Sequence, residues 1–402
     1  MASTFNIDSR DHYRDKVFPS PFHSRQAALN DLREWSRWFD YLSVPAYYSA
    51  TMEYFAARNA CAVFDLTPMT KHLITGSEAL PFLNRLVTRD VSKLKPGRVG
   101  YTVWCNDQGQ VIDDGTIFHL SEGEYRLCSQ EHQIDWLMTN QEGFDVSIVE
   151  DTHDVAGLAL QGPTSCATLK RMGLAGVENL TPFGLTHFDF EGTRLMVSRT
   201  GFTGDLGYEL WIHPDYAETL WDRLFAAGEL HGIKPLGSEA LDMLRIEAGF
   251  IMAGTEFMPA MQTVRPTHTR SPFELGLDWL VDFRKPLFNG RRALLAEKER
   301  GSRYALVKLD IEDNKPANHS YVYDTRKNNI GWVTSAMWSP SAKQNIALAT
   351  VATPHGSTGE EMLVEIYYQR ELKWSRKMAR AVVVDKPFWD PPRRRQTPPA
   401  NY

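Results

Sequence analysis

Two adjacent acids, Asp113 and Asp114, interrupt an apolar and β-branched stretch that follows a turn-forming segment at residues 106–109. The turn predicts a hairpin in which residues 99–105 pair with residues 111–120, so both acids fall in mid-strand. Successive side chains of a strand point to opposite faces, so one carboxylate can face a cavity while its neighbour meets solvent or a backbone donor. A carboxylate in an apolar strand is costly unless it is paired, which makes the pair a candidate for acid–base chemistry. A simple Asp-Asp-Gly turn is the competing interpretation.

A second candidate is the glycine-rich segment from Arg199 to Glu209, in which three glycines recur at every third position between two expected strands. Glycines leave the backbone free to approach a ligand closely. No lysine follows them and no helix opens on them, so the segment is neither a Walker loop nor a dinucleotide fingerprint. An ordinary hairpin loop is the alternative.

Other reaction types find no support in the sequence. The histidines form no metal-binding pair of the His-Glu-x-x-His kind. The sequence also lacks the Gly-x-Ser-x-Gly motif that is typical of a serine nucleophile. Zinc and a disulfide framework are not expected, because the cysteines lie far apart without a Cys-x-x-Cys pair. They are Cys61, Cys105, Cys128 and Cys166.

Length and composition limit the partners. A chain of 402 residues with 43% hydrophobic and 23% charged residues predicts two or three domains. The net charge of -6 and the lack of a long basic stripe argue against nucleic acid as a partner. Residues 1–6 are polar and no apolar stretch approaches membrane-spanning length, so we expect a cytoplasmic protein with no membrane partner. Residues 393–395, all arginine, sit in a proline-rich tail that reads as an extended, solvated end.

Hydrophobic periodicity and turn residues predict two adjacent α+β units followed by a β-rich domain. The first 50 residues or so are irregular and aromatic-rich, as in a segment pinned across a domain surface. Ser77 and Ser238 are predicted N-caps, and Pro214 is predicted to start a helix. Helices are expected over residues 51–60, 78–87, 132–140, 165–172, 214–225 and 238–247. Strands are expected over 61–64, 125–128, 144–149, 155–160, around 188, 193–198 and 208–212, and then over 306–309, 330–333, 347–351, 362–367 and 377–384. The last five favour a barrel or sandwich.

Taken in order, these segments resemble the folate-dependent aminomethyltransferase family, which includes the T-protein of glycine cleavage and related demethylases. Each motif is weak alone, but the ordered set spans nearly the whole chain. The matching segments are residues 20–23, 64–69, 86–91, Tyr101, 109–114, 161–163, 199–209, 245–248, 272–277 and 386–388.

The resemblance implies an α+β fold of three domains in a cloverleaf, with a pterin held centrally and the first domain interrupted by the second. The expected bounds are 1–66 with 151–266 for the first α+β domain and 67–150 for the second, which carries the Asp113-Asp114 strand. The β-rich domain, a barrel or sandwich, is expected over 267–402.

The resemblance also implies site residues and tetrahydrofolate as the cofactor. The pterin-facing acid falls on Asp114 and the pterin-contacting glutamate on Glu209. A carboxylate near N5 or N10 can hold the pterin, offset developing positive charge or assist proton removal. Asp113 is left as a structural neighbour. Further cofactor-binding positions fall on Phe202, Tyr101, Met69 and Arg199.

Two departures from the family pattern bear on the substrate. An arginine that T-proteins commonly keep appears here as Leu241, and Phe202 stands where tyrosine is common. A more apolar pocket suits a small methylated onium or methoxy compound, so we expect a demethylase that moves a methyl group to N5 of tetrahydrofolate. The alternatives are an aminomethyltransferase that works on a lipoylated carrier protein and a non-catalytic folate-binding protein. The donor itself is not identified by the sequence.

Overall fold

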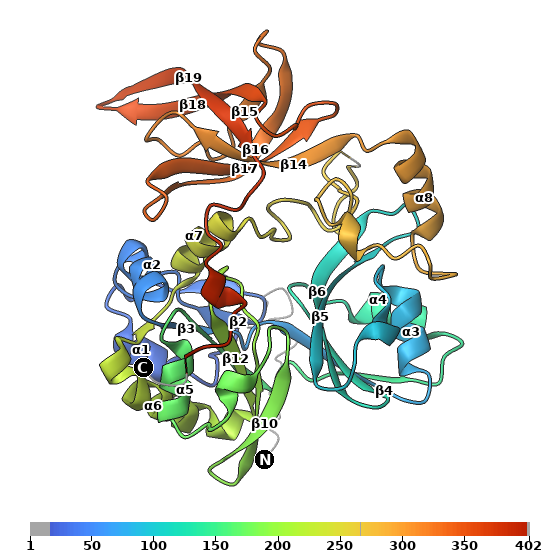
Figure 1. The fold of residues 1–402 in the computed structure, drawn as a ribbon, viewed down its shortest axis with the longest axis vertical. Helices are drawn as coiled ribbons and strands as arrows, with labels where there is room; N and C mark the ends of the chain where they lie inside the picture. Colours follow the sequence, from blue (N-terminus) through green and yellow to red (C-terminus); the bar gives the residue numbers. More distant parts are fainter. Residues whose placement is uncertain (1–16, 266, 400–402) are drawn as a thin grey trace, which may run out of the picture.

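The computed structural model describes residues 17–265 and 267–399, and the polar start at residues 1–6 lies outside this part. Three units surround the middle of the molecule, each built on its own β-structure (Figure 1). A six-stranded sheet lies at the lower left, a five-stranded sheet at the lower right and a closed barrel at the top. The expected mixture of two α+β parts and a C-terminal β-structure is confirmed, and the latter is a barrel.

The six-stranded sheet is covered by helices on both faces. Its strand order is β10-β11-β12-β9-β3-β13, and all pairs are antiparallel except β13 with β3. Alternate residues point to opposite faces, so Val63 packs towards α5 and α6 while Phe64 packs towards α2 and α7. The elements are β3 (Ala62–Asp65), β9 (Ala156–Gln161), β10 (Leu185–Phe190), β11 (Thr193–Ser198), β12 (Gly207–Ile212), β13 (Lys234–Pro235), α2 (Ala50–Asn59), α5 (Ser165–Arg171), α6 (Ala217–Gly228) and α7 (Ser238–Ala248).

The five-stranded sheet, in the order β5-β6-β7-β4-β8, carries the two adjacent acids. The predicted hairpin is present, and Asn106 closes its turn by accepting hydrogen bonds from the amides of Gln108 and Gln110. Helices α3 and α4 pack on one face through Phe82, Leu137 and their neighbours. The elements are β4 (Thr70–Thr75), β5 (Arg98–Cys105), β6 (Val111–Ser121), β7 (Glu124–Ser129), β8 (Ser147–Glu150), α3 (Ala79–Leu86) and α4 (Ile134–Gln141).

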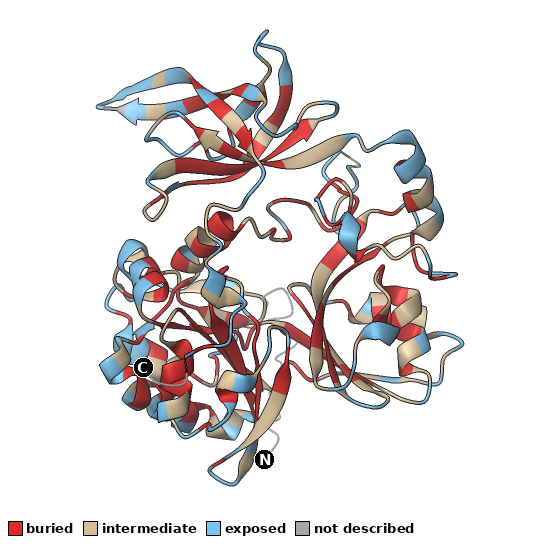
Figure 2. Ribbon diagram, viewed as in Figure 1, coloured by how far each residue is buried: buried red, intermediate tan, exposed pale blue. Residues whose placement is uncertain are grey.

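The barrel closes in the order β14-β17-β16-β15-β18-β19 and encloses its own apolar core. Five of its strands coincide with the predicted ones, whereas the short β15 was not predicted. Figure 2 shows that each of the three units has its own buried interior. The strands are β14 (Tyr304–Ile311), β15 (Tyr321–Tyr323), β16 (Asn329–Ser339), β17 (Gln344–Ala352), β18 (Glu361–Arg370) and β19 (Lys373–Val384).

Several local expectations were wrong. Ser77 does not cap α3, because its hydroxyl donates to Asp145 and Glu78 takes the cap position. Ser238 is the first residue of α7 and makes no capping bond, since Gly237 precedes it at the cap. Pro214 starts a 3₁₀ turn, and α6 begins only at Ala217.

Both ends of the described chain contain regular elements that the sequence did not predict. The N-terminal region forms α1 (His23–Leu29) and a small hairpin of β1 (Ser36–Trp38) with β2 (Tyr41–Ser43). The arginine-rich tail is not a solvated end. It forms a 3₁₀ turn over Pro392–Arg394 and packs on the six-stranded unit, where Arg393 pairs with Asp205.

Candidate functional site

Asp113 and Asp114 are adjacent on β6 but differ in burial and in hydrogen-bond partners. The Asp113 side chain is fully buried, and its carboxylate accepts hydrogen bonds from the amides of Asp114 and Glu131 and from the side chain of Gln133. Burial and the neighbouring Asp114 raise the pKa of Asp113 well above its usual value. Its oxygens are occupied by the protein's own donors, so its surroundings are those of a structural group.

Asp114, on the opposite face, is only partly buried. The hydroxyl of Tyr101, from β5 of the same hairpin, donates to its Oδ2 at 2.8 Å. Burial raises the pKa of Asp114 to about 6, against the lowering effect of the Tyr101 hydrogen bond. The nearby charge of Glu256 also contributes to the raised pKa of Asp114. A carboxyl with such a pKa can change protonation near neutral pH, as an acid–base group must.

Glu209 lies on β12, nearly buried beside a pair of hydroxyl groups. Thr200 donates to its Oε2 at 2.6 Å and Ser198 reaches the same oxygen at 3.5 Å. Burial raises the pKa of Glu209 to about 7, although both hydroxyls lower it. Within the part of the chain that the structure describes, Oε1 has no hydrogen-bond donor. This oxygen is therefore available to a donor-rich ligand such as the edge of a pterin ring, so the residue fits the cofactor that the sequence implies.

The two sheets meet at a shared apolar cluster, which brings these carboxyl groups to one interface. The rings of Phe118 on β6 and Trp211 on β12 lie 5.8 Å apart in an edge-to-face arrangement. The charge of Glu209 acts on the pKa of Cys128 in β7, whose register partner on β6 is Thr116. Glu209 is thus close to the strand that carries Asp114, although the two acids are 95 positions apart in sequence (209 minus 114).

The glycine-rich segment is shaped by a buried amide side chain. A Cβ atom added at Gly201 or Gly207 would lie 2.0 or 2.2 Å from Oε1 of Gln161. The side chain of Gln161 donates to the carbonyl of Thr200 and accepts from the hydroxyl of Thr203. These two hydrogen bonds fix the loop against β9. The group that lies closest to these two glycines is therefore the Gln161 side chain of the protein itself. The sequence interpretation, in which the glycines let the backbone approach a ligand, does not explain why these two positions are glycine.

The remaining predicted site residues are less uniform. Phe202 stacks on Phe250, with ring centroids 5.6 Å apart. Met69 is half-buried in the apolar cluster that joins the sheets, and its carbonyl accepts a hydrogen bond from the buried ammonium of Lys71. Arg199 donates to the carbonyls of Leu180 and of the tail. Its guanidinium thus faces backbone, and these contacts do not bring it together with Asp114 or Glu209.

Sequence reasoning missed two residues beside Asp114. Trp279 lies with its ring centroid 6.2 Å from that of Tyr101 and is 64% exposed. Glu256 is buried in an ion pair with Arg245 at 2.8 Å and raises the pKa of Asp114. Both residues come from residues 249–290, where Trp279 lies in a 3₁₀ turn (Asp278–Leu280) and no periodic pattern marks either residue. The tryptophan at position 279 is the signal that the sequence offers in this stretch.

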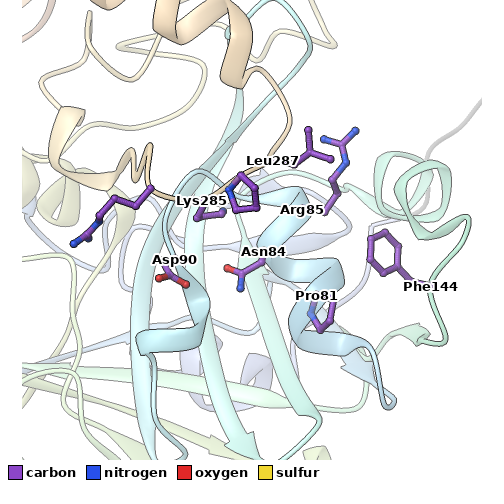
Figure 3. Close-up of a pocket in the computed structure, with 9 residues that line it drawn as sticks. Pro81, Asn84, Arg85, Asp90, Phe144, Lys285 and Leu287 are labelled. Atoms are coloured by element: carbon purple, nitrogen blue, oxygen red, sulfur yellow. The ribbon is translucent and has the colours of Figure 1, made fainter.

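A cavity of about 420 Å³ lies elsewhere, between α3 and the segment that leads to α8 (Arg291–Arg300). Figure 3 shows Asn84, Arg85, Asp90 and Lys285 around it. The ammonium of Lys285 donates to the carbonyls of Val87 and Arg89, and burial lowers its pKa to about 7. None of the predicted site residues lines this cavity.

No group of three or more His, Cys, Asp or Glu side chains among residues 17–265 and 267–399 is placed to hold a metal ion. In the same ranges, no helix combines the length and apolar character needed to cross a bilayer. All four cysteines are buried as free thiols.

Comparison with known proteins covers nearly the whole chain. The model described as "GCVT N-terminal domain" matches residues 21–285, and the one described as "Glycine cleavage T-protein C-terminal barrel domain" matches residues 305–390. An aminomethyltransferase of Caldanaerobacter subterraneus is 32% identical over 95% of this chain and 97% of its own length. A second, from Desulforamulus reducens, is 32% identical over 86% of this chain and 92% of its own length.

Two further comparisons extend this result. A trimethylamine-oxide aldolase of Ruegeria pomeroyi is 36% identical over 85% of this chain, which matches only 43% of that protein. The crystal structure of glycine cleavage system aminomethyltransferase T from Bartonella henselae superposes with a TM-score of 0.80, at 24% identity, over 93% of this chain and 99% of that one. The superposition shows that the fold is shared.

Proposed function

Because this chain belongs to the glycine cleavage T-protein family of folate-dependent one-carbon transferases, we propose that Asp114 is its acid–base group in the transfer of a one-carbon unit to tetrahydrofolate. The observation that carries the proposal is the Tyr101–Asp114 hydrogen bond between the paired strands β5 and β6, on a carboxyl whose pKa burial raises to about 6. Tetrahydrofolate, when bound, supplies the nucleophilic nitrogen that accepts the one-carbon unit.

Asp114 would act at the proton on that nitrogen. As a carboxylate it can accept the proton that the nitrogen loses when the new bond to carbon forms, and it can offset the positive charge that develops there. The Tyr101 hydroxyl fixes Oδ2, which leaves Oδ1 to meet the substrate. Proximity and orientation then contribute much of the rate, because a fixed carboxylate does not have to be ordered during the reaction.

Glu209 and Phe202 would hold the pterin ring. The open Oε1 of Glu209 can accept hydrogen bonds from ring N–H groups, and Phe202 offers an aromatic face for stacking. Since the pKa of Glu209 is about 7, the ionised acceptor is present mainly above neutral pH in the free protein. Binding of a ring that donates hydrogen bonds would favour the ionised form and lower this pKa.

The donor has two candidates, and the first is an aminomethyl group on a lipoylated carrier protein. The names of the Caldanaerobacter and Desulforamulus relatives support it, at 32% identity over most of both chains. In this reaction the carbon–sulfur bond to the carrier breaks, the carrier thiol and ammonia are released, and 5,10-methylenetetrahydrofolate forms.

The second candidate is demethylation of a small methylated onium or methoxy compound, which gives 5-methyltetrahydrofolate. Leu241 supports it, because the position lacks the expected arginine and its side chain packs in the apolar cluster. Arg245, one turn further along α7, does not substitute for it. Its guanidinium is committed to Asp242, Glu256 and Ser335.

One assay separates these candidates from a folate-binding protein without chemistry. The protein is incubated with tetrahydrofolate and either an aminomethyl-loaded lipoylated carrier or a panel of methylated amines, sulfonium and aryl-methoxy compounds, and the folate products are separated. Carrier-dependent ammonia with 5,10-methylenetetrahydrofolate supports the first donor, and 5-methyltetrahydrofolate supports the second. Tight folate binding with neither product would refute the proposed transfer.

A further inference from the structure

The chain leaves the barrel and returns to the six-stranded unit. In Figure 1 this last segment, in dark red, runs from the barrel past α7. The amide of Trp389 donates to the carbonyl of Glu247 at 3.0 Å near the end of α7, and the 3₁₀ turn Pro392–Arg394 follows. Residues 389–394 therefore lie beside the glycine-rich segment, which carries Phe202 and leads to Glu209.

The contact is centred on Asp205, an acid of the glycine-rich segment with a fully buried side chain. Arg393 binds it with two parallel hydrogen bonds, from Nε to Oδ1 at 2.7 Å and from Nη2 to Oδ2 at 2.8 Å. The indole of Trp389 donates to Oδ2 at 3.0 Å. Such a fork of two bonds is the geometry in which arginine holds a carboxylate most firmly.

A second arginine ties the same groups to the body of the unit. Arg58 on α2 lies 4.5 Å from the ring centroid of Trp389, while Arg393 lies 5.6 Å from that ring. Arg58 also donates to the carbonyl of Thr203 at 2.8 Å and pairs with the buried Glu247. The glycine-rich segment is thus fixed at Thr203 and at Asp205, on the two sides of Gly204.

The start of the segment is held by the tail as well. Arg199 donates to the carbonyl of Gln396 at 2.5 Å, so the tail touches both ends of the stretch that contains Phe202. Arg394 lies 5.1 Å from the ring centroid of Phe250, the ring on which Phe202 stacks. The position of Phe202 therefore depends on contacts made by residues almost 200 positions later in the chain.

We propose that Arg393 and Trp389 are positioning residues that clamp the glycine-rich segment through Asp205 and so hold Phe202 and Glu209 ready for the folate ring. The inference rests on the proposed function, in which these two residues contact the cofactor. A segment that is already ordered loses less entropy when the ligand binds. Loss of the clamp is therefore expected to weaken tetrahydrofolate binding far more than it slows the bound complex.

The test compares Arg393→Ala with Arg395→Ala. The control removes an arginine from the same tail whose side chain is 60% exposed and pairs with Asp390. We expect Arg393→Ala to raise the Kd for tetrahydrofolate about tenfold and to leave kcat within about twofold. Arg395→Ala should match the wild type, and Arg393→Lys should recover part of the affinity because it restores the charge but not the fork.

Backbone amide hydrogen exchange over residues 200–206, measured without folate, shows whether the segment is held. Faster exchange together with a raised Kd supports the clamp. Unchanged exchange, or faster exchange with an unchanged Kd, would overturn it. If the wild type binds no folate, the proposed function fails while the exchange comparison still decides whether Arg393 fixes the segment. Trp389→Phe keeps an aromatic ring and removes the indole N–H donor, so it gives the same two readouts if Arg393→Ala does not fold.

Discussion

The hydroxyl of Tyr101 lies 2.8 Å from Oδ2 of Asp114, and the two residues belong to the paired strands of one hairpin. The tyrosine faces Thr116 in the register and the aspartate faces Val103, so they meet diagonally across the ladder. A short hairpin with a well-formed turn holds this pair in place. The hydrogen bond from Tyr101 engages one oxygen of the Asp114 carboxyl, Oδ2.

Asp114→Asn is expected to lower turnover at least 100-fold, since general acid–base catalysis contributes about 10²- to 10⁴-fold. The amide keeps the size of the side chain and can still accept from Tyr101, so the Kd for tetrahydrofolate should change by less than about threefold. Product analysis and calorimetric titration measure the two effects. Asp107→Asn, at the exposed turn of the same hairpin, is the matched control. Equal activity of Asp114→Asn and the control would refute the assigned role.

Tyr101→Phe removes the hydrogen bond that lowers the pKa of Asp114, so this pKa should rise above about 6. If the carboxylate form is active, the acidic limb of the profile of kcat/KM against pH shifts to higher pH. Activity then falls most near pH 6 and is largely retained near pH 8. A uniform loss at all pH values would instead indicate that Tyr101 serves only in packing.

Glu209→Gln should change stability in a pH-dependent way. The pKa of Glu209 is about 7 in the folded protein and lies above the ordinary value of 4.5, so between these values the folded state holds a proton that the unfolded chain has released. The free energy of unfolding of the wild type therefore falls as pH rises through this window. The variant lacks this penalty, and its advantage over the wild type should be greater at pH 8 than at pH 4 by on the order of 3 kcal/mol.

Denaturant titrations of both proteins at the two pH values measure that difference. The same variant should bind tetrahydrofolate more weakly, because an amide supplies fewer acceptor sites than a carboxylate. An equal stability difference at pH 4 and pH 8 would show that Glu209 does not titrate with a raised pKa.

Gly201→Ala places a methyl group where Oε1 of Gln161 lies only 2.0 Å away. Overpacking of this kind costs about 1–3 kcal/mol, so the free energy of unfolding should fall by that amount. Removing the obstructing side chain should relieve the strain. In a double-mutant cycle, Gly201→Ala combined with Gln161→Ala is expected to be more stable than the sum of the two single effects predicts. Strict additivity would mean that the clash is relieved in another way.

The sequence predicts the hairpin of Asp114 well because its signals are local. A turn at residues 106–109 and β-branched flanks specify two paired strands, and pairing alone determines that Asp113 and Asp114 face opposite ways. The barrel strands are predicted for the same reason. The N-cap roles predicted for Ser77 and Ser238 are wrong. A serine hydroxyl can bind another acceptor, as the hydroxyl of Ser77 does on Asp145.

What the sequence could not predict depends on contacts between distant segments. The three glycines of the Arg199–Glu209 segment suggest an open backbone, yet Gln161 fills the space beneath two of them. Arg393 looks like one of three equivalent cations, but only the fold shows that it meets Asp205, 188 positions earlier. Trp279 reaches Tyr101 from a single 3₁₀ turn (Asp278–Leu280) far along the chain. No periodicity encodes such pairings, because they arise when separate units pack together.

The place of β3 in the six-stranded sheet also governs the order in which the chain can fold during synthesis. β3 lies between β9 and β13, whose residues are made only after the entire five-stranded unit. That unit uses a continuous stretch from Thr70 to Glu150 and can assemble as it leaves the ribosome. β3 therefore gains its first partner only when β9 has emerged, and its other edge stays unpaired until Pro235 has emerged. A ribosome that pauses between these two points would therefore expose an incomplete sheet next to a finished one.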